Sequence, residues 1–179
     1  MPYTKKTLHE LAYMYGTDKL QHGYIPFYEQ YLPKNPKKIL EIGVKEGRSV
    51  RMWMNYFPEA EIHGLDLFKE FPVPFHDERV KFWEGDQTNQ YILEQLRREK
   101  FDVVIEDASH DCRKHWITLF SLIDTCSQYY IEDLHTCSDT FFMEGLSYEH
   151  TIKGAIKNGK MPFDCILSEN ENIALICRK

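Results

Sequence analysis

The sequence has little clustered positive charge, which argues against non-specific nucleic-acid binding. Its 179 residues carry 22 Lys and Arg against 28 Asp and Glu, a formal net charge of −6. The basic runs "KNPKK" and "RREK" are short and are typical of solvated surface, whereas nucleic-acid binding needs Lys and Arg gathered on one face. We therefore expect no nucleic-acid partner.

The sequence also lacks the patterns of a disulfide framework, a zinc site and a membrane span. The five cysteines are odd in number and none forms a C-x-x-C pair, so reduced, packed thiols are expected. No apolar run approaches membrane-spanning length, and "MPYTKKTLHE" lacks the apolar core of a signal peptide. These absences predict a cytoplasmic protein without a membrane partner.

What the sequence does contain is an alternation of helix-like and strand-like segments. Helices are expected at residues 4–15, 27–31, 49–57, 89–100 and 114–126, and strands at 37–44, 61–66, 79–86, 101–107 and 127–135. "FPVPF" is expected to be a loop, 138–160 helix and loop, and "DCILSENENIALICRK" two strands joined by the polar turn "ENEN".

Strands that alternate with helices predict an α/β fold, with a parallel sheet and helices on both faces. The C-terminal hairpin would add an antiparallel strand. We expect a single domain over residues 1–179, made of a helical cap (1–36) and a core (37–179). In such sheets ligands bind at the carboxyl ends of the strands, so polar residues at those ends are the candidate site.

The first strand ends in a glycine motif, "LEIGVKEGRSV", which reads E-x-G-x-x-x-G. A dinucleotide-binding loop would read G-x-G-x-x-G, but Lys45 stands at the second glycine position. The pattern therefore favours a cofactor without phosphates, such as S-adenosylmethionine. An acidic residue at the end of the second strand can accept hydrogen bonds from ribose hydroxyls. The candidate cofactor contacts from these strand ends are Glu41, Gly43, Ser49, Asp66, Asp86 and Gln87.

Carboxylates also follow the strands 101–107 and 127–135. If these two strands are neighbours, their ends lie about 5 Å apart, so that Asp107, Glu132 and Asp133 crowd together. Three carboxylates in one pocket need compensation, and an all-oxygen site suits Mg²⁺ or Mn²⁺. Such an ion would bind a vicinal diol and lower the pKa of its hydroxyls.

His110 follows Asp107 in "DASHD" and is the candidate catalytic residue. A neutral imidazole there would take the hydroxyl proton as a methyl group arrives, with His135 as the reserve candidate. The alternative is that His110 caps the following helix.

The segments "YGTDK", "LEIGV", "VRMW", "DASH" and "EDLHT" together resemble the metal-dependent sugar O-methyltransferases that tailor macrolide antibiotics such as mycinamicin and tylosin. The similarity spans about residues 13–137, and "DASH" with "EDLHT" is its specific part. The resemblance implies a class I S-adenosylmethionine-dependent methyltransferase fold, which is Rossmann-like. It implies that Asp107, Glu132 and Asp133 hold Mg²⁺ and that His110 is the general base. It also implies that "YGTDK" covers the methionine end of the cofactor, through Tyr15, Thr17 and Lys19.

The predicted function is therefore an S-adenosylmethionine- and Mg²⁺-dependent O-methyltransferase that acts on a hydroxyl of a sugar or glycosylated metabolite. Two alternatives stay open: a nicotinamide-dependent oxidoreductase on a similar sheet, and a non-catalytic binding module with the same fold. The sequence leaves open the acceptor, the hydroxyl methylated, the role of residues 138–160, and whether the chain forms a homo-oligomer.

Overall fold

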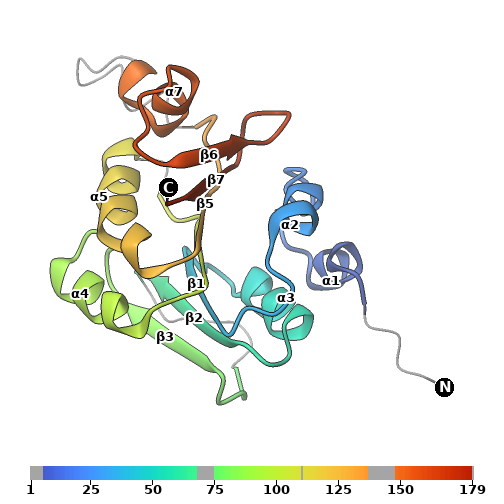
Figure 1. Ribbon diagram of the computed structural model, residues 1–179. Helices are drawn as coiled ribbons and strands as arrows, with labels where there is room; N and C mark the ends of the chain where they lie inside the picture. Colours follow the sequence, from blue (N-terminus) through green and yellow to red (C-terminus); the bar gives the residue numbers. More distant parts are fainter. Residues whose placement is uncertain (1–5, 68–74, 110, 137–147, 179) are drawn as a thin grey trace.

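The computed structural model describes residues 6–67, 75–109, 111–136 and 148–178. In this part of the chain seven strands form one sheet in the order β3-β2-β1-β4-β5-β7-β6 (Figure 1). The strands are β1 (Lys38–Ile42), β2 (Glu61–Asp66), β3 (Val80–Glu84), β4 (Val103–Glu106), β5 (Gln128–Ile131), β6 (Asp164–Leu167) and β7 (Ala174–Cys177). The helices are α1 (Leu8–Tyr15), α2 (Ile25–Tyr31), α3 (Arg48–Tyr56), α4 (Gln90–Glu99), α5 (Cys112–Leu122) and α7 (Ile152–Lys157), with single 3₁₀ turns at Ile123–Thr125 and Tyr148–His150.

The pairing confirms the predicted mixed sheet. β1 pairs in parallel with both β2 and β4, and β4 pairs in parallel with β5. β7 runs antiparallel to β5 and β6 runs antiparallel to β7, as the C-terminal hairpin pattern predicts. Because Glu106 is in register with Ile131, the residues that follow them, Asp107 and Glu132, leave neighbouring strands side by side.

Helices cover both faces of the sheet, and each face has its own core. α1, α2 and α3 lie on one face, where Leu8, Tyr28 and Trp53 pack against Ile39 and Ile105. α4, α5 and α7 lie on the other face, where Leu93 and Leu119 pack against Leu40 and Val104 (Figure 1). The alternation of Leu40 with Ile39, and of Val104 with Ile105, follows from the two-residue period of a strand. Successive residues at a strand end therefore face opposite sides of the sheet.

Local sequence signals explain the element boundaries better than the hydrophobic period does. The first helix begins at Leu8 rather than at residue 4, because Thr7 and Glu10 form a capping box, and it ends at Gly16 in the left-handed conformation. α5 begins at Cys112, two residues earlier than predicted, because Asp111 caps it by accepting from the backbone N–H of Arg113 at 2.8 Å.

The structure bears on two predictions for the C-terminal part of the chain, the end of the fifth strand and the region 138–160. The fifth strand ends at Ile131, so Glu132 and Asp133 leave the sheet as a loop instead of continuing the strand. Much of the predicted helix-and-loop region 138–160 lies outside the described residues, and its described part contains α7. Within the described residues no helix is long and apolar enough to cross a bilayer.

His63 in the middle of β2 makes the stability of the fold depend on pH. Its side chain is fully buried, and Trp83 Nε1 donates to its Nδ1 at 3.3 Å. Burial, the main cause, lowers the pKa of His63 below its ordinary value of 6.5. The unfolded chain therefore takes up the proton first, so the free energy of unfolding falls as the pH drops below about 6.5.

We predict that His63→Phe, which keeps a buried ring, flattens the decline of the unfolding free energy between about pH 7 and pH 5, with a change of slope of at most about 1.4 kcal/mol per pH unit. Urea unfolding of the wild type and the variant at each pH measures this difference. His9→Gln, which removes an exposed imidazole, is the matched control and should keep the wild-type slope. Equal slopes for the wild type and His63→Phe would contradict the buried neutral imidazole.

Candidate functional site

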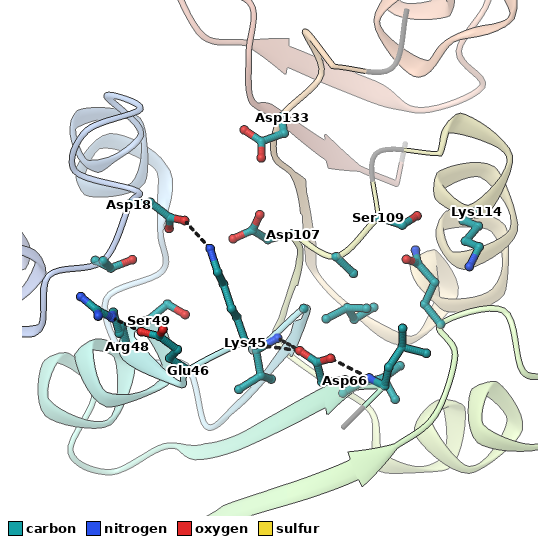
Figure 2. A pocket seen from close by; sticks show the side chains of 18 of the residues that line it. Asp18, Lys45, Glu46, Arg48, Ser49, Asp66, Asp107, Ser109, Lys114 and Asp133 are labelled. Carbon is teal, nitrogen blue, oxygen red and sulfur yellow. Dashed lines mark hydrogen bonds and ion pairs between the residues drawn. The ribbon is translucent and has the colours of Figure 1, made fainter. Parts of the chain in front are cut away.

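A pocket of about 920 Å³ opens at the carboxyl ends of the parallel strands. Its walls are residues 42–46 and 48–49 at the end of β1 and the start of α3, 65–67 at the end of β2, 85–87 after β3 and 107–109 after β4, together with Gly16, Thr17, Asp18, Gln21, Lys114 and Asp133 (Figure 2). The pocket therefore lies at the edge of the sheet where ligands of open α/β folds bind.

Gly43 has a structural reason to be glycine that does not depend on any ligand. Its φ is +91°, and a Cβ built on it would lie 2.0 Å from the carbonyl oxygen of Asp107. The ends of β1 and β4 thus approach too closely for a side chain. Gly47, with φ +74°, is the N-cap residue of α3 and has the left-handed conformation that glycine adopts readily.

Asp66 holds the loop after β1 in place. Its Oδ2 accepts from the backbone N–H groups of Val44 and Lys45, both at 2.7 Å, and its Oδ1 accepts from Leu67 N–H at 2.6 Å. Asp66 lines the pocket, as predicted. However, three backbone groups already use its oxygens, so its Oδ1 has more room than its Oδ2 for a ribose hydroxyl.

Lys19 is fully buried and its ammonium lies among three carboxylates. Its Nζ is 2.6 Å from Asp107 Oδ2, 2.9 Å from Glu132 Oε2 and 3.2 Å from Glu41 Oε1. Burial works to lower the pKa of Lys19, but the three carboxylates outweigh it and raise the pKa well above its usual range. Lys19 is therefore a permanent cation that joins the segment between α1 and α2 to the ends of β1, β4 and β5.

Two buried tyrosines complete the bonding of the acidic residues after β5. Tyr28 donates its hydroxyl to Glu132 Oε1, and Tyr24 donates to Asp133 Oδ1 at 2.5 Å. Burial first, and then the charge of Asp107, raises the pKa of Glu132 well above its usual range. Burial also raises the pKa of Glu41, whose Oε2 accepts from the Ser49 hydroxyl at 2.8 Å. The single ammonium of Lys19 therefore does not compensate the negative charge of the carboxylates around it.

The acidic residues differ in how they face the pocket. Asp107 and Asp133 line it, with side chains 20% and 12% exposed (Figure 2). The Glu132 side chain, in contrast, is 1% exposed and faces Lys19 and Tyr28. Asp133 has φ +54°, a left-handed conformation that turns the chain sharply after β5. Strain of this kind is common at functional sites.

The carboxylate oxygens of Asp107, Glu132 and Asp133 are donors that suit a magnesium ion, but the arrangement of the three side chains suits it less well. Within the described ranges, no group of three or more His, Cys, Asp or Glu side chains is placed to hold a metal ion. Two pocket-facing carboxylates in an undercompensated acidic site do match Mg²⁺, which is usually held by one or two carboxylates and by waters or substrate oxygens. The predicted ligand set Asp107, Glu132 and Asp133 stays a prediction.

The predicted cofactor residues fall into two groups. Thr17, Gly43, Ser49, Asp66, Asp86 and Gln87 line the pocket, and Tyr15, Lys19 and Glu41 do not. Tyr15 packs against the core on the α1–α3 face, and Glu41 is directed to Lys19 and Ser49. For Lys19 and Glu41, mutual charge neutralisation accounts for their position behind the pocket wall.

On the side of β3, Asp86 and Gln87 have their own partners. Lys114 Nζ donates to Asp86 Oδ2 at 2.6 Å, and this bond is the main cause that lowers the pKa of Asp86 to about 2. Gln87 is buried, with its amide nitrogen directed at Glu106. His110 lies outside the described residues, and His135 is exposed two residues beyond Asp133.

The sequence interpretation missed three cations that line the pocket: Lys45, Arg48 and Lys114. Arg48 Nη1 donates to the carbonyl of Gly16 at 3.1 Å, and Lys45 extends toward Asp18, with 3.9 Å between Nζ and Oδ2 (Figure 2). Lys45 and Arg48 both stand in the glycine motif. Their position at the N-terminus of the following helix was the signal in the sequence that could have identified them as pocket residues.

No family model matches the chain. Curated relatives include a tetracenomycin pathway enzyme of Streptomyces olivaceus, "8-demethyl-8-(2-methoxy-alpha-L-rhamnosyl)-tetracenomycin-C 3'-O-methyltransferase", 32% identical over 146 residues, which are 72% of this chain and 37% of the relative. Mycinamicin VI 2''-O-methyltransferase of Micromonospora griseorubida is 34% identical over 150 residues, which are 74% of this chain and 37% of the relative. The chain thus spans little more than a third of the length of these relatives.

The structure is similar to the MycE methyltransferase from the mycinamycin biosynthetic pathway, solved with Mg, S-adenosylhomocysteine (SAH) and mycinamycin VI. The TM-score is 0.80 at 26% sequence identity, over 97% of this chain and 54% of that chain. These findings confirm the predicted fold class, a class I S-adenosylmethionine-dependent methyltransferase fold. They also confirm the resemblance to sugar O-methyltransferases.

The cluster around Lys19 leads to a stability prediction. Lys19→Met keeps the aliphatic volume but leaves three carboxylates without their cation, and breaking a buried ion pair in this way costs about 3–5 kcal/mol. Urea unfolding should show a correspondingly lower midpoint. Lys45→Met, at a pocket lysine whose side chain is 82% exposed, is the control and should unfold close to the wild type. A wild-type midpoint for Lys19→Met would contradict the role of Lys19 as the counter-ion.

Proposed function

We propose that this chain, a homologue of the sugar O-methyltransferases, is a methyltransferase that uses S-adenosylmethionine and Mg²⁺ to methylate a hydroxyl of a sugar or glycosylated metabolite. The observation that carries the proposal is the pocket at the strand ends, with Asp107 and Asp133 facing into it beside the glycine loop. The relatives named above support the acceptor class, because their names describe O-methylation of a rhamnosyl tetracenomycin and of mycinamicin VI.

The pocket residues suit the parts of this cofactor. When bound, S-adenosylmethionine supplies a methyl group on a sulfonium. Asp66 Oδ1 and the turn at Asp86–Gln87 are on the side that would take the ribose and adenine. Arg48 and Lys45, next to Thr17 and Ser49 at the N-terminus of α3, would hold the carboxylate of the amino-acid tail.

Asp107 and Asp133, with Glu132 beside them, would hold Mg²⁺, which supplies Lewis acidity toward a diol when bound. His110 would then accept the proton that leaves the hydroxyl. Lys19, Tyr24 and Tyr28 would keep these carboxylates in place behind the pocket. Cytoplasmic location and the absence of nucleic-acid and membrane partners are part of the same proposal.

Transfer of a labelled methyl group from S-adenosylmethionine to a panel of deoxysugar and rhamnosyl glycosides tests the function. We expect transfer in the presence of Mg²⁺, loss of transfer in EDTA and recovery when Mg²⁺ is added back. SAH should still bind in EDTA, because the ion serves the acceptor. Transfer at full rate in metal-free buffer would remove the metal from the proposal. Oxidation of any glycoside with NAD, in place of methyl transfer, would favour the oxidoreductase.

His110→Ala should lower the rate of methyl transfer by about 10²- to 10⁴-fold, the usual worth of a general base. SAH and Mg²⁺ affinities should stay close to the wild type, because the imidazole acts on the acceptor. His135→Ala is the matched control at the other candidate imidazole and should keep the wild-type rate. A loss of rate in His135→Ala with a normal rate in His110→Ala would assign the base to the segment after β5.

A further inference from the structure

Glu106 is a buried carboxylate that the proposed mechanism leaves without a role. It ends β4 directly before Asp107, and its side chain is fully buried. Because successive strand residues face opposite sides, Asp107 is directed to Lys19 on the α1–α3 face, whereas Glu106 faces the core beneath α4 and α5. A buried carboxylate is costly unless it is hydrogen-bonded, so its partners indicate what it is for.

The first partner connects Glu106 to the loop after β3. Gln87 Nε2 donates to Glu106 Oε1 at 2.6 Å and to Thr118 Oγ1 at 3.1 Å. The second partner, Tyr129 of β5, donates its hydroxyl to Glu106 Oε2 at 2.6 Å. Glu106 thus uses both oxygens, one toward the pocket loop 85–87 and one toward the neighbouring strand.

His115 of α5 connects the same cluster to the loop after β4. Its Nε2 is 2.6 Å from the carbonyl oxygen of Ser109 and 3.9 Å from Glu106 Oε1. Since a carbonyl only accepts, the hydrogen must be on Nε2, so His115 donates to Ser109. Ser109 lines the pocket and immediately precedes His110 in the chain.

We propose that Glu106 is a positioning residue, the centre of a buried polar cluster (Glu106, Gln87, Thr118, His115 and Tyr129) that sets two pocket loops relative to each other. One loop, 85–87, is on the adenine side of the pocket, and the other, 107–109, carries a carboxylate and leads to the candidate base. The cluster anchors both loops to α5 and β5. The assignment of one loop to the adenine and of the other to the candidate base rests on the proposed function.

The cluster predicts that substitutions at Glu106 and at His115 affect SAH affinity and turnover differently, which a merely structural role would not produce. Glu106→Gln keeps the volume but adds an N–H group that faces one of two donors, Gln87 or Tyr129. We expect SAH to bind about 10-fold more weakly and turnover to fall as well. His115→Phe removes the bond to the Ser109 carbonyl and keeps the bonds of Glu106 to Gln87 and Tyr129, so we expect turnover to fall about 10-fold while SAH affinity changes by less than about 3-fold.

Tyr130→Phe is the matched control. It removes a hydroxyl from the next residue of β5, which donates to Gln128 at 3.0 Å on the other face of the sheet. We expect wild-type SAH affinity and turnover. If Glu106→Gln and His115→Phe reduce affinity and turnover to the same extents as each other, or not at all, the division between the loops is wrong.

Amide hydrogen exchange separates this inference from the proposed function, because it needs no ligand. In Glu106→Gln we expect faster exchange at residues 85–88 and 107–109 than in the wild type and in Tyr130→Phe. Unchanged exchange in both loops would overturn the positioning role, whatever the protein binds. Faster exchange in a protein that binds no SAH would keep the positioning role and refute the proposed cofactor.

Discussion

The rest of the site depends on the ion pairs that the buried ammonium of Lys19 makes with three carboxylates. This ammonium is the point where the segment between α1 and α2 meets the ends of three strands, through Glu41, Asp107 and Glu132. Without this cation the sheet edge would hold a group of mutually repelling carboxylates under the N-terminal helices. With it, the segment between α1 and α2 is fastened to the sheet, and Thr17 and Asp18 line the pocket.

The sheet sorts the acidic residues of its edge by face, and this sorting accounts for the unusual ending of β4. Glu41 and Asp107 point toward Lys19 and the α1–α3 face, where the site also holds Tyr24 and Tyr28. Glu106 points to the opposite face and bonds to Gln87 and Tyr129. Consecutive acidic residues at one strand end thus serve two environments, one that faces ligands and one that holds the surrounding loops.

The fold and the location of the site could be predicted from the sequence because they depend on local periodicity. Alternating strands and helices predict a parallel sheet whose carboxyl ends share one edge. The neighbourhood of the two acidic strands was a condition of the site prediction, and the pairing of β4 with β5 meets it and places Asp107 next to Glu132. The partners of those residues could not be predicted. Lys19 bonds to residues 88 and 113 positions away, and no local pattern links them. The same holds for Asp66, whose position was predicted but whose oxygens are used by backbone groups of the glycine loop.

The pocket at the strand ends is proposed to take S-adenosylmethionine and not a dinucleotide. The glycine loop carries Lys45, whose φ is +52°, at the position where a dinucleotide-binding loop has glycine. The pocket wall at Asp107 and Asp133 is acidic, which disfavours the phosphates of a dinucleotide. Calorimetric titration of the purified chain with SAH and, separately, with NADH tests this directly. We predict saturable binding of one SAH per chain and no heat of binding with NADH. Binding of NADH by a folded chain that does not bind SAH would contradict the account.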